Sequence, residues 1–146
     1  MKHKKNYLLP LTFLVSFLFY NCSNSLPIYD NWHGDIAERR GKYIFKEKHL
    51  ELDLFDEDGI FCYFLIQNKT DTLVRTQENA SIWHSYFLYL DDEENLWVSS
   101  GDIGDWVWLK TDGTYTKHFL SKIDRKLIPQ KVWKNLPESS RDVYEK

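Results

Sequence analysis

From residue 42 onward, the sequence is a series of short segments in which apolar residues recur with the two-residue period of a β-strand. In HLELDLF, residues 49–55, leucines alternate with Glu51 and Asp53, which predicts a strand with one buried face. The turn DEDG follows, with Gly59 at a position that favours a left-handed backbone. The next segment, IFCYFLIQ at 60–67, is apolar on both faces, so we expect it at the centre of a sheet, covered on two sides.

Five more segments with strand character follow along the chain. They are TLVRTQ at 72–77, IWHSYFLYL at 82–90, LWVSS at 96–100, DWVWLK at 105–110 and TYTKHFLS at 114–121. Together these make about seven strands within about eighty residues, separated by turn-forming sequences, which is the spacing of small all-β domains. The sequence therefore predicts a mainly all-β fold with antiparallel strands, arranged as a small sandwich or as a barrel.

The C-terminal part changes from strand to helix periodicity. In LIPQKVWKNLP, residues 127–137, apolar side chains recur at helical spacing, Pro129 suits a first helical turn, and Pro137 stops the helix. We expect a short helix that lies across the sheet or closes one mouth of a barrel. Residues 35–137 then form one β domain with a C-terminal helix, and residues 138–146 are expected to be a frayed tail.

The N-terminal part has the pattern of a secretory signal. Three lysines stand in the first five residues, and they precede fourteen uncharged residues, YLLPLTFLVSFLFY at 7–20. Fourteen residues are fewer than the ~20 that a membrane-spanning helix needs, and Pro10 interrupts the run. The pattern predicts that residues 1–21 are a signal peptide.

The position of Cys22 resembles the bacterial lipoprotein pathway, in which the chain is cut before a cysteine that then carries acyl chains. Phe19, Tyr20 and Asn21 depart from the strict cleavage motif, and the looser form of spirochaete and Bacteroidetes-like lipoproteins is the more similar one. The resemblance implies a lipid on Cys22, a tether at 22–34 and a domain held on the bacterial envelope. Because Ser23 follows the cysteine, it also implies the outer membrane, facing the periplasm. The alternative is a cut after Ser25, which would discard Cys22.

The net charge of the chain disfavours one class of partner, and its two cysteines offer few ways to form a disulfide. Removing residues 1–21 takes away three lysines and no acid, so the formal net charge falls from −3 to −6. An acidic domain of this kind is not expected to bind nucleic acid through phosphate contacts. Cys62 is expected to be a small buried thiol, and a disulfide with Cys22 is the alternative if the leader is kept.

No motif in the chain predicts catalysis or a cofactor. The histidines are not spaced as metal ligands, Ser99 and Ser100 lack the nucleophile elbow, and no glycine-rich phosphate loop is present. We therefore expect a protein that is not an enzyme and needs no metal or cofactor, with an unrecognised hydrolase as a minor alternative.

Tryptophans and acids gather around the turn GDIG and offer a candidate binding surface. One interpretation is ordinary core packing; the other is an exposed aromatic and acidic loop that binds a protein or glycan partner. The candidate residues are Trp97, Asp102, Asp105, Trp106 and Trp108. The expected function is a non-catalytic binding module on the envelope, such as an inhibitor, an immunity-type protein or an adaptor. The alternative is a carrier of a small apolar ligand, because GKYIFKEKHLELDLFDEDGIFCYF is loosely similar to the opening hairpin of lipocalin-like envelope proteins.

Overall fold

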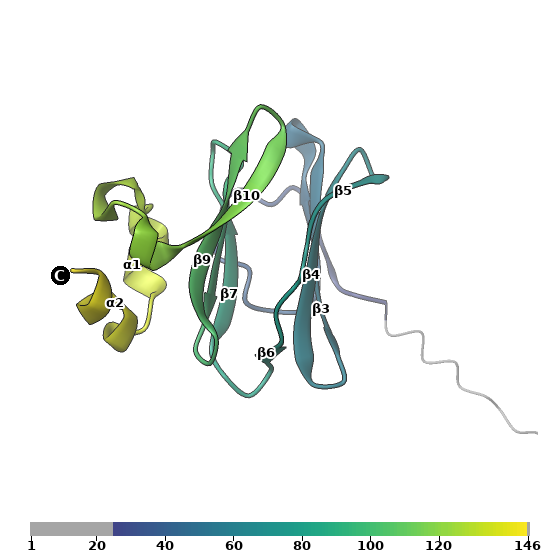
Figure 1. Cartoon of the computed structure of the whole chain (residues 1–146). Coiled ribbons are helices and arrows are strands. Elements are labelled where there is room, and N and C mark those ends of the chain that lie inside the picture. The colour runs from purple at the N-terminus through teal and green to yellow at the C-terminus, as the bar shows by residue number, and fades with distance from the viewer. Residues whose placement is uncertain (1–24, 146) are drawn as a thin grey trace, which may run out of the picture.

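The computed structural model describes residues 25–145, which form two β-sheets packed face to face (Figure 1). The first sheet has the order β1-β2-β3-β4-β5, with β6 paired to β4, and the second has the order β10-β9-β8-β7. The sheets do not join into a closed barrel, so the fold is an all-β sandwich. The strands are β1 (Ile28–Tyr29), β2 (Gly41–Phe45), β3 (Leu50–Glu57), β4 (Ile60–Gln67), β5 (Asp71–Arg75), β6 (Ala80–Ser81), β7 (Tyr86–Leu90), β8 (Leu96–Ser100), β9 (Gly104–Thr111) and β10 (Thr114–Phe119).

The hairpin of β3 and β4 forms as its sequence predicts. The two strands pair antiparallel from Leu50 opposite Gln67 to Glu57 opposite Ile60. Asp58 and Gly59 both have positive φ, which is the backbone of a tight two-residue hairpin turn. The alternating leucines of β3 are all buried, which confirms the prediction of one buried face.

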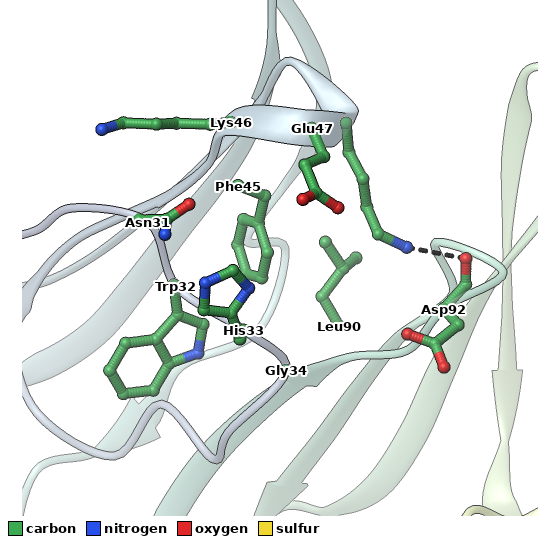
Figure 2. Close-up of a pocket in the computed structure, with 10 residues that line it drawn as sticks. Asn31, Trp32, His33, Gly34, Phe45, Lys46, Glu47, Leu90 and Asp92 are labelled. Atoms are coloured by element: carbon green, nitrogen blue, oxygen red, sulfur yellow. Dashed lines mark hydrogen bonds between the residues drawn. The ribbon is translucent and has the colours of Figure 1, made fainter.

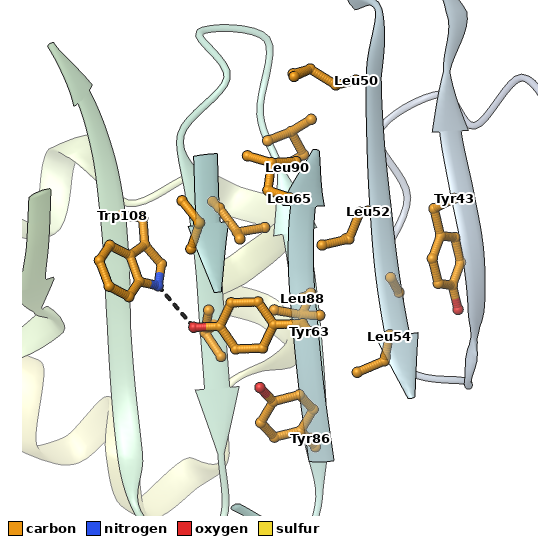
Figure 3. Packing of buried hydrophobic residues seen from close by; sticks show 14 of the residues in the cluster. Tyr43, Leu50, Leu52, Leu54, Tyr63, Leu65, Tyr86, Leu88, Leu90 and Trp108 are labelled. Atoms are coloured by element: carbon orange, nitrogen blue, oxygen red, sulfur yellow. Dashed lines mark hydrogen bonds between the residues drawn. The ribbon is translucent and has the colours of Figure 1, made fainter. Parts of the chain in front are cut away.

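The main core fills the space between the sheets with leucines and aromatic rings (Figure 3). Leu52, Leu65 and Leu88 are fully buried, and they come from both sheets. The Tyr63 hydroxyl accepts hydrogen bonds from the indole N–H groups of Trp106 and Trp108, at 3.3 and 2.8 Å. Side chains thus occupy the interior of the sandwich, and the Tyr63 hydroxyl links β4 of one sheet to β9 of the other.

A second core lies on the side of the second sheet that faces away from the first, where the C-terminal segments cover it (Figure 1). The covering elements are η2 (Leu120–Lys122), η3 (Arg125–Leu127), α1 (Gln130–Asn135) and α2 (Glu138–Tyr144). The apolar side chains predicted for the helix face are all buried; they are Ile128, Val132, Trp133 and Leu136. The prediction of a short helix between the two prolines is confirmed.

The expected frayed tail at 138–146 is wrong for most of its length. Residues 138–144 form helix α2, with Pro137 before the first turn and Glu138 inside it, where an acid is favourable. The helix is held because the Tyr144 hydroxyl donates to Asp105 Oδ2 at 2.9 Å. A single aromatic side chain near the end of the helix therefore ties the tail to β9.

The expected tether at 22–34 is also too long, because the fold begins within it. Strand β1 pairs in parallel with β2, and the ring of Tyr29 stacks on that of Tyr43 with 4.7 Å between centroids. Trp32 packs edge-on against the same Tyr43 ring, also at 4.7 Å. Residues 1–21, the predicted signal peptide, and Cys22 lie outside the described part of the chain.

The outer face of the first sheet is not covered, which corrects the expectation for β4. Cys62, Phe64 and Ile66 point to this face and are half-buried rather than enclosed on two sides. Phe55 of β3 packs against Phe64 at 5.2 Å, which shields part of the apolar surface. Cys62 is therefore not the buried thiol that was expected, and within residues 25–145 it forms no disulfide.

The turns between the strands form the two ends of the sandwich. The Trp83 end consists of the turns at 57–60, 81–85 and 101–104, near β6 in Figure 1. The Phe45 end consists of the turns at 46–49 and 68–70 and of the loop 91–95. Within residues 25–145, no helix is both long enough and apolar enough to span a bilayer.

Candidate functional site

The three tryptophans predicted to form a binding surface lie in the interior. Trp97, Trp106 and Trp108 are 2, 1 and 8% exposed. Trp106 and Trp108 face the first sheet, while Trp97 faces the C-terminal helices. Their strands belong to a sheet that is covered on both sides, so apolar residues on either face become buried. The expectation of an exposed aromatic loop surface is wrong for these residues, and the core-packing interpretation holds.

Asp105 has a structural position rather than a surface one. It is 3% exposed and accepts hydrogen bonds from the Ser99 hydroxyl and the Tyr144 hydroxyl. Burial, followed by the neighbouring Asp105 charge, raises the pKa of Tyr144, so that hydroxyl stays protonated and continues to donate. Asp105 thus joins β8, β9 and α2.

Asp102 is the one predicted site residue that lies at the surface, in the turn 101–104. Its Oδ2 atom accepts from the backbone N–H of Ser81 at 2.8 Å and lies 3.6 Å from His84 Nδ1, while Oδ1 accepts from the Ser100 hydroxyl. Burial raises the pKa of Asp102, but the hydrogen bonds from Ser100 and Ser81 and the nearby His84 outweigh it, so the pKa lies below its ordinary value. The carboxylate clamps two turns together.

This cluster does not have the geometry of a catalytic triad. In a triad the serine hydroxyl donates to a histidine, and the aspartate lies on the far side of that histidine. Here the hydroxyl of Ser100 donates to the carboxylate of Asp102 itself, and His84 approaches the same carboxylate. The arrangement therefore places no histidine next to the Ser100 hydroxyl, and its partner is the Asp102 carboxylate.

Two adjacent hollows at the Phe45 end form the best candidate site. The first holds about 150 Å³ and has an aromatic wall of Trp32 and Phe45 beneath a charged rim (Figure 2). Its rim is fixed by Lys48, whose ammonium group donates to the carbonyl oxygens of Asp91 and Asp92 at 3.1 and 2.6 Å. Its lining residues are Asn31, Trp32, His33, Gly34, Phe45, Lys46, Glu47, Lys48, Leu90 and Asp92.

The second hollow lies beside the first, next to the turn 46–49, and holds about 340 Å³. It shares Phe45 and Lys46 with the first hollow, so the two form one composite surface around the start of the turn 46–49. Its lining residues are Asp30, Ile44, Phe45, Lys46, His49, Leu50, Glu51, Asn68 and Lys69. We call this composite surface the Phe45 site.

The backbone around the Phe45 site adopts conformations that side chains disfavour. His49, Asn68 and Lys69, which line the second hollow, have φ values of 52, 51 and 65°, and Asn31 of the first hollow has 60°. Positive φ is the usual backbone of tight hairpin turns, as at Asp58, and asparagine adopts it readily because its short polar side chain bonds locally. The turns that line the Phe45 site therefore have a defined backbone shape.

The charges of the Phe45 site are balanced and accessible. Lys46 forms an ion pair with Asp30 at 2.7 Å, and both side chains are more than half exposed. Exposed pairs of this kind contribute little to stability, so they are available to reorganise around a partner. Within residues 25–145, no group of three or more His, Cys, Asp or Glu side chains is placed to hold a metal ion.

Sequence reasoning missed this site because its parts are distant in the chain. Trp32 and His33 fall within the predicted tether, and Phe45 reads as an ordinary strand residue. The one local signal is the turn NKT at 68–70, which marks a bend but no ligand.

Comparison of the chain with protein-family models, with curated proteins and with solved structures finds no match.

Proposed function

We propose that the protein is an envelope lipoprotein, cut before Cys22 and anchored there by acyl chains, that acts as a non-catalytic binding module. Its partner, a protein or a glycan in the envelope, would bind the Phe45 site. Inhibitor, immunity-type protein and adaptor are the roles that fit such a module, and the outer membrane facing the periplasm is the location that Ser23 favours.

The single observation that carries the binding role is the composite Phe45 site itself. The half-buried ring of Trp32 and the buried floor of Phe45, which is 5% exposed, lie beside exposed lysine and carboxylate groups, and interfaces commonly combine a rigid apolar centre with a polar rim. The preformed turns lower the ordering cost of binding, because fewer side chains and loops need to be fixed.

The packed interior favours a binding module over a carrier of a small apolar ligand. A lipocalin-like carrier holds its ligand inside the β-structure, where side chains leave a cavity. In this chain Leu52, Leu65 and Leu88 meet between the sheets instead (Figure 3). The hydrogen-bonded group around Asp102 supports the non-catalytic part of the proposal, since it is arranged to hold two turns together.

The test is a quantitative crosslinking capture from the protein's own envelope extract. The test variant carries Lys46→Glu and Lys69→Glu, two exposed changes at the Phe45 site. The control carries Lys122→Glu and Lys126→Glu, which change the net charge equally at exposed positions far from it. We expect the test variant to recover at least ~10-fold less of a saturable partner, as for a loss of about 1.4 kcal/mol or more at an interface.

Equal recovery by wild type and by the Lys46→Glu, Lys69→Glu variant would contradict the Phe45 site as the binding surface. Loss of recovery in both charge variants would point to a general charge effect and would contradict it as well. Circular dichroism of each variant separates loss of binding from loss of folding.

A further inference from the structure

Three of the six large apolar side chains that are most exposed in residues 25–145 lie at or near the Trp83 end, and the other three, Ile28, Leu127 and Val143, lie on β1 and on the C-terminal segments. Trp83 is 85% exposed and Ile103 is 37% exposed, and they lie on the turns 81–85 and 101–104. Phe119, 55% exposed, ends β10 opposite Trp106, close to the turn 101–104. Among the described residues, the Phe45 end carries no large apolar side chain of comparable exposure. Of the two ends of the sandwich, the Trp83 end is therefore the one that exposes large apolar side chains.

The turns that carry Trp83 and Ile103 are held together as one rigid unit. Asp102 accepts from Ser81 N–H, and Gly101 N–H donates to the Ser85 carbonyl oxygen at 2.8 Å. Gly101 also packs closely, because a Cβ atom at that position would lie 2.7 Å from Ser85 Oγ. An exposed tryptophan on a clamped turn loses little conformational freedom when it inserts into another phase.

The chain enters the fold from the same end. Ser25 and Leu26 line a surface hollow together with Phe61, and Phe61 pairs with Ala80, next to Ser81 of the Trp83 end. Strand β1 then runs away from that end, parallel to β2. The first described residues therefore lie nearer the Trp83 end than the Phe45 end.

If Cys22 carries acyl chains as proposed, the length of chain between Cys22 and Ser25 determines which end of the sandwich can contact the membrane. Three residue steps from Ser25 to Cys22 span at most about 11 Å. From Phe61 to Gln67 the sheet extends six residues, or about 20 Å, before the turns of the Phe45 end begin. The Phe45 end is out of reach, whereas the hairpin tip at 58–59 lies only about 10 Å from the level of Phe61.

We propose that the Trp83 end docks into the interface of the bilayer that holds the N-terminal lipid, with the Trp83 indole at the headgroup level. This inference rests on the proposed lipid attachment. Tryptophan is enriched at membrane interfaces because its ring is apolar and its N–H is polar. The Phe45 site then faces away from the membrane, open to a partner.

The charges at the docking end determine how it depends on lipid composition. Arg39 and Arg40 are exposed near the chain entry, while Glu57 and Asp58 project from the hairpin tip. Because both signs are present, attraction to anionic lipid is partly cancelled. Docking depends on apolar insertion and has little dependence on salt.

The test uses the native lipidated protein reconstituted in phosphatidylethanolamine and phosphatidylglycerol vesicles whose acyl chains carry bromine, which quenches nearby tryptophan fluorescence. We expect quenching of the wild type, and at least a ~3-fold smaller quenched fraction in Trp83→Phe, since the indole at the interface is removed. Ile103→Ser with Phe119→Ser should also reduce quenching. Leu127→Ser with Val143→Ser, two exposed changes on the C-terminal segments, should leave it unchanged.

Vesicle flotation and the mass of the N-terminal peptide are measured on the same samples. Protein that floats and carries acyl chains, but is quenched no more than Trp83→Phe, overturns the docking proposal and leaves the lipid anchor intact. An N-terminal peptide without acyl chains overturns the anchor, and with it the short tether on which docking depends.

Discussion

At the scale of residues, Tyr63 links the two sheets through a polar contact inside an apolar core. Its hydroxyl is the acceptor for two buried indole N–H groups, from Trp106 and Trp108. Burial raises the pKa of Tyr63 far above its ordinary value, so the hydroxyl stays neutral. Removing the hydroxyl leaves two buried donors without this acceptor, and an unsatisfied buried donor costs more than an average hydrogen bond contributes.

Tyr63→Phe should therefore lower the free energy of unfolding by about 2–4 kcal/mol, measured by urea titration, because each orphaned N–H costs about 1–3 kcal/mol. Tyr29→Phe is the matched control, since its ring packs on Tyr43 and its hydroxyl makes no hydrogen bond to another of residues 25–145, and it should change stability by less than ~0.5 kcal/mol. Equal unfolding midpoints for Tyr63→Phe and wild type would show that the two indoles find other acceptors.

Asp102 gives a prediction about pH. Its pKa in the folded protein lies below the ordinary value, so its contribution to stability is complete above about pH 4 and is lost as the pH falls through the folded-state pKa. Between about pH 6 and pH 3, Asp102→Asn should lose less stability than wild type, because its amide does not titrate. Urea midpoints at each pH measure this. An equal loss of stability in the two proteins as the pH falls would mean that folding does not lower the pKa of Asp102.

At the scale of elements, the sequence predicts a strand well when its two faces differ and poorly when both are apolar. Strand β3, with alternating leucines and acids, forms as expected. Strands β4 and β9 are both apolar on two faces, yet β9 is covered on both sides and the outer face of β4 is open. The difference arises because the C-terminal helices pack on the second sheet and not on the first. This packing joins segments that are distant in the chain, so local periodicity does not predict it.

The start of the strand expected in IWHSYFLYL is also misplaced, because it too depends on a segment that is distant in the chain. Its alternation predicts a strand from residue 82, but pairing with β8 begins at Tyr86. The residues before it form the turn that presents Trp83, since Gly101 and Asp102 bond to that turn. Local periodicity does not reveal where a partner strand ends.

Helix α2 supplies a prediction at this scale. Tyr144→Ala removes the hydrogen bond to Asp105 and the ring that packs beside the second core. Amide hydrogen exchange in residues 140–144 should become at least ~10-fold faster, while exchange in β8 and β9 stays slow, because local opening of a short helix needs little free energy. Val143→Ala, an exposed change on the same helix, should leave exchange unaltered. Unchanged protection in Tyr144→Ala would show that another contact holds the helix.

At the scale of the whole molecule, the two ends of the sandwich differ in what they expose. The Trp83 end presents apolar side chains on clamped turns, and the Phe45 end presents hollows with charged rims. The all-β class could be predicted from the two-residue period of the apolar side chains and from the turn sequences. The composition of the Trp83 end and of the Phe45 end could not be predicted in this way. Each is assembled from three or more segments that meet only after the sheets have packed. Sandwich versus barrel was also open, because closure depends on whether the edges of the two sheets pair.

The lipid anchor that we propose at Cys22 can be detected in the protein itself. The measurement is mass spectrometry of the N-terminal peptide, from protein extracted from its native membrane. We expect a peptide that begins at Cys22 and carries the added mass of two or three acyl chains. A peptide that begins at Leu26, or one that retains Met1, would contradict it.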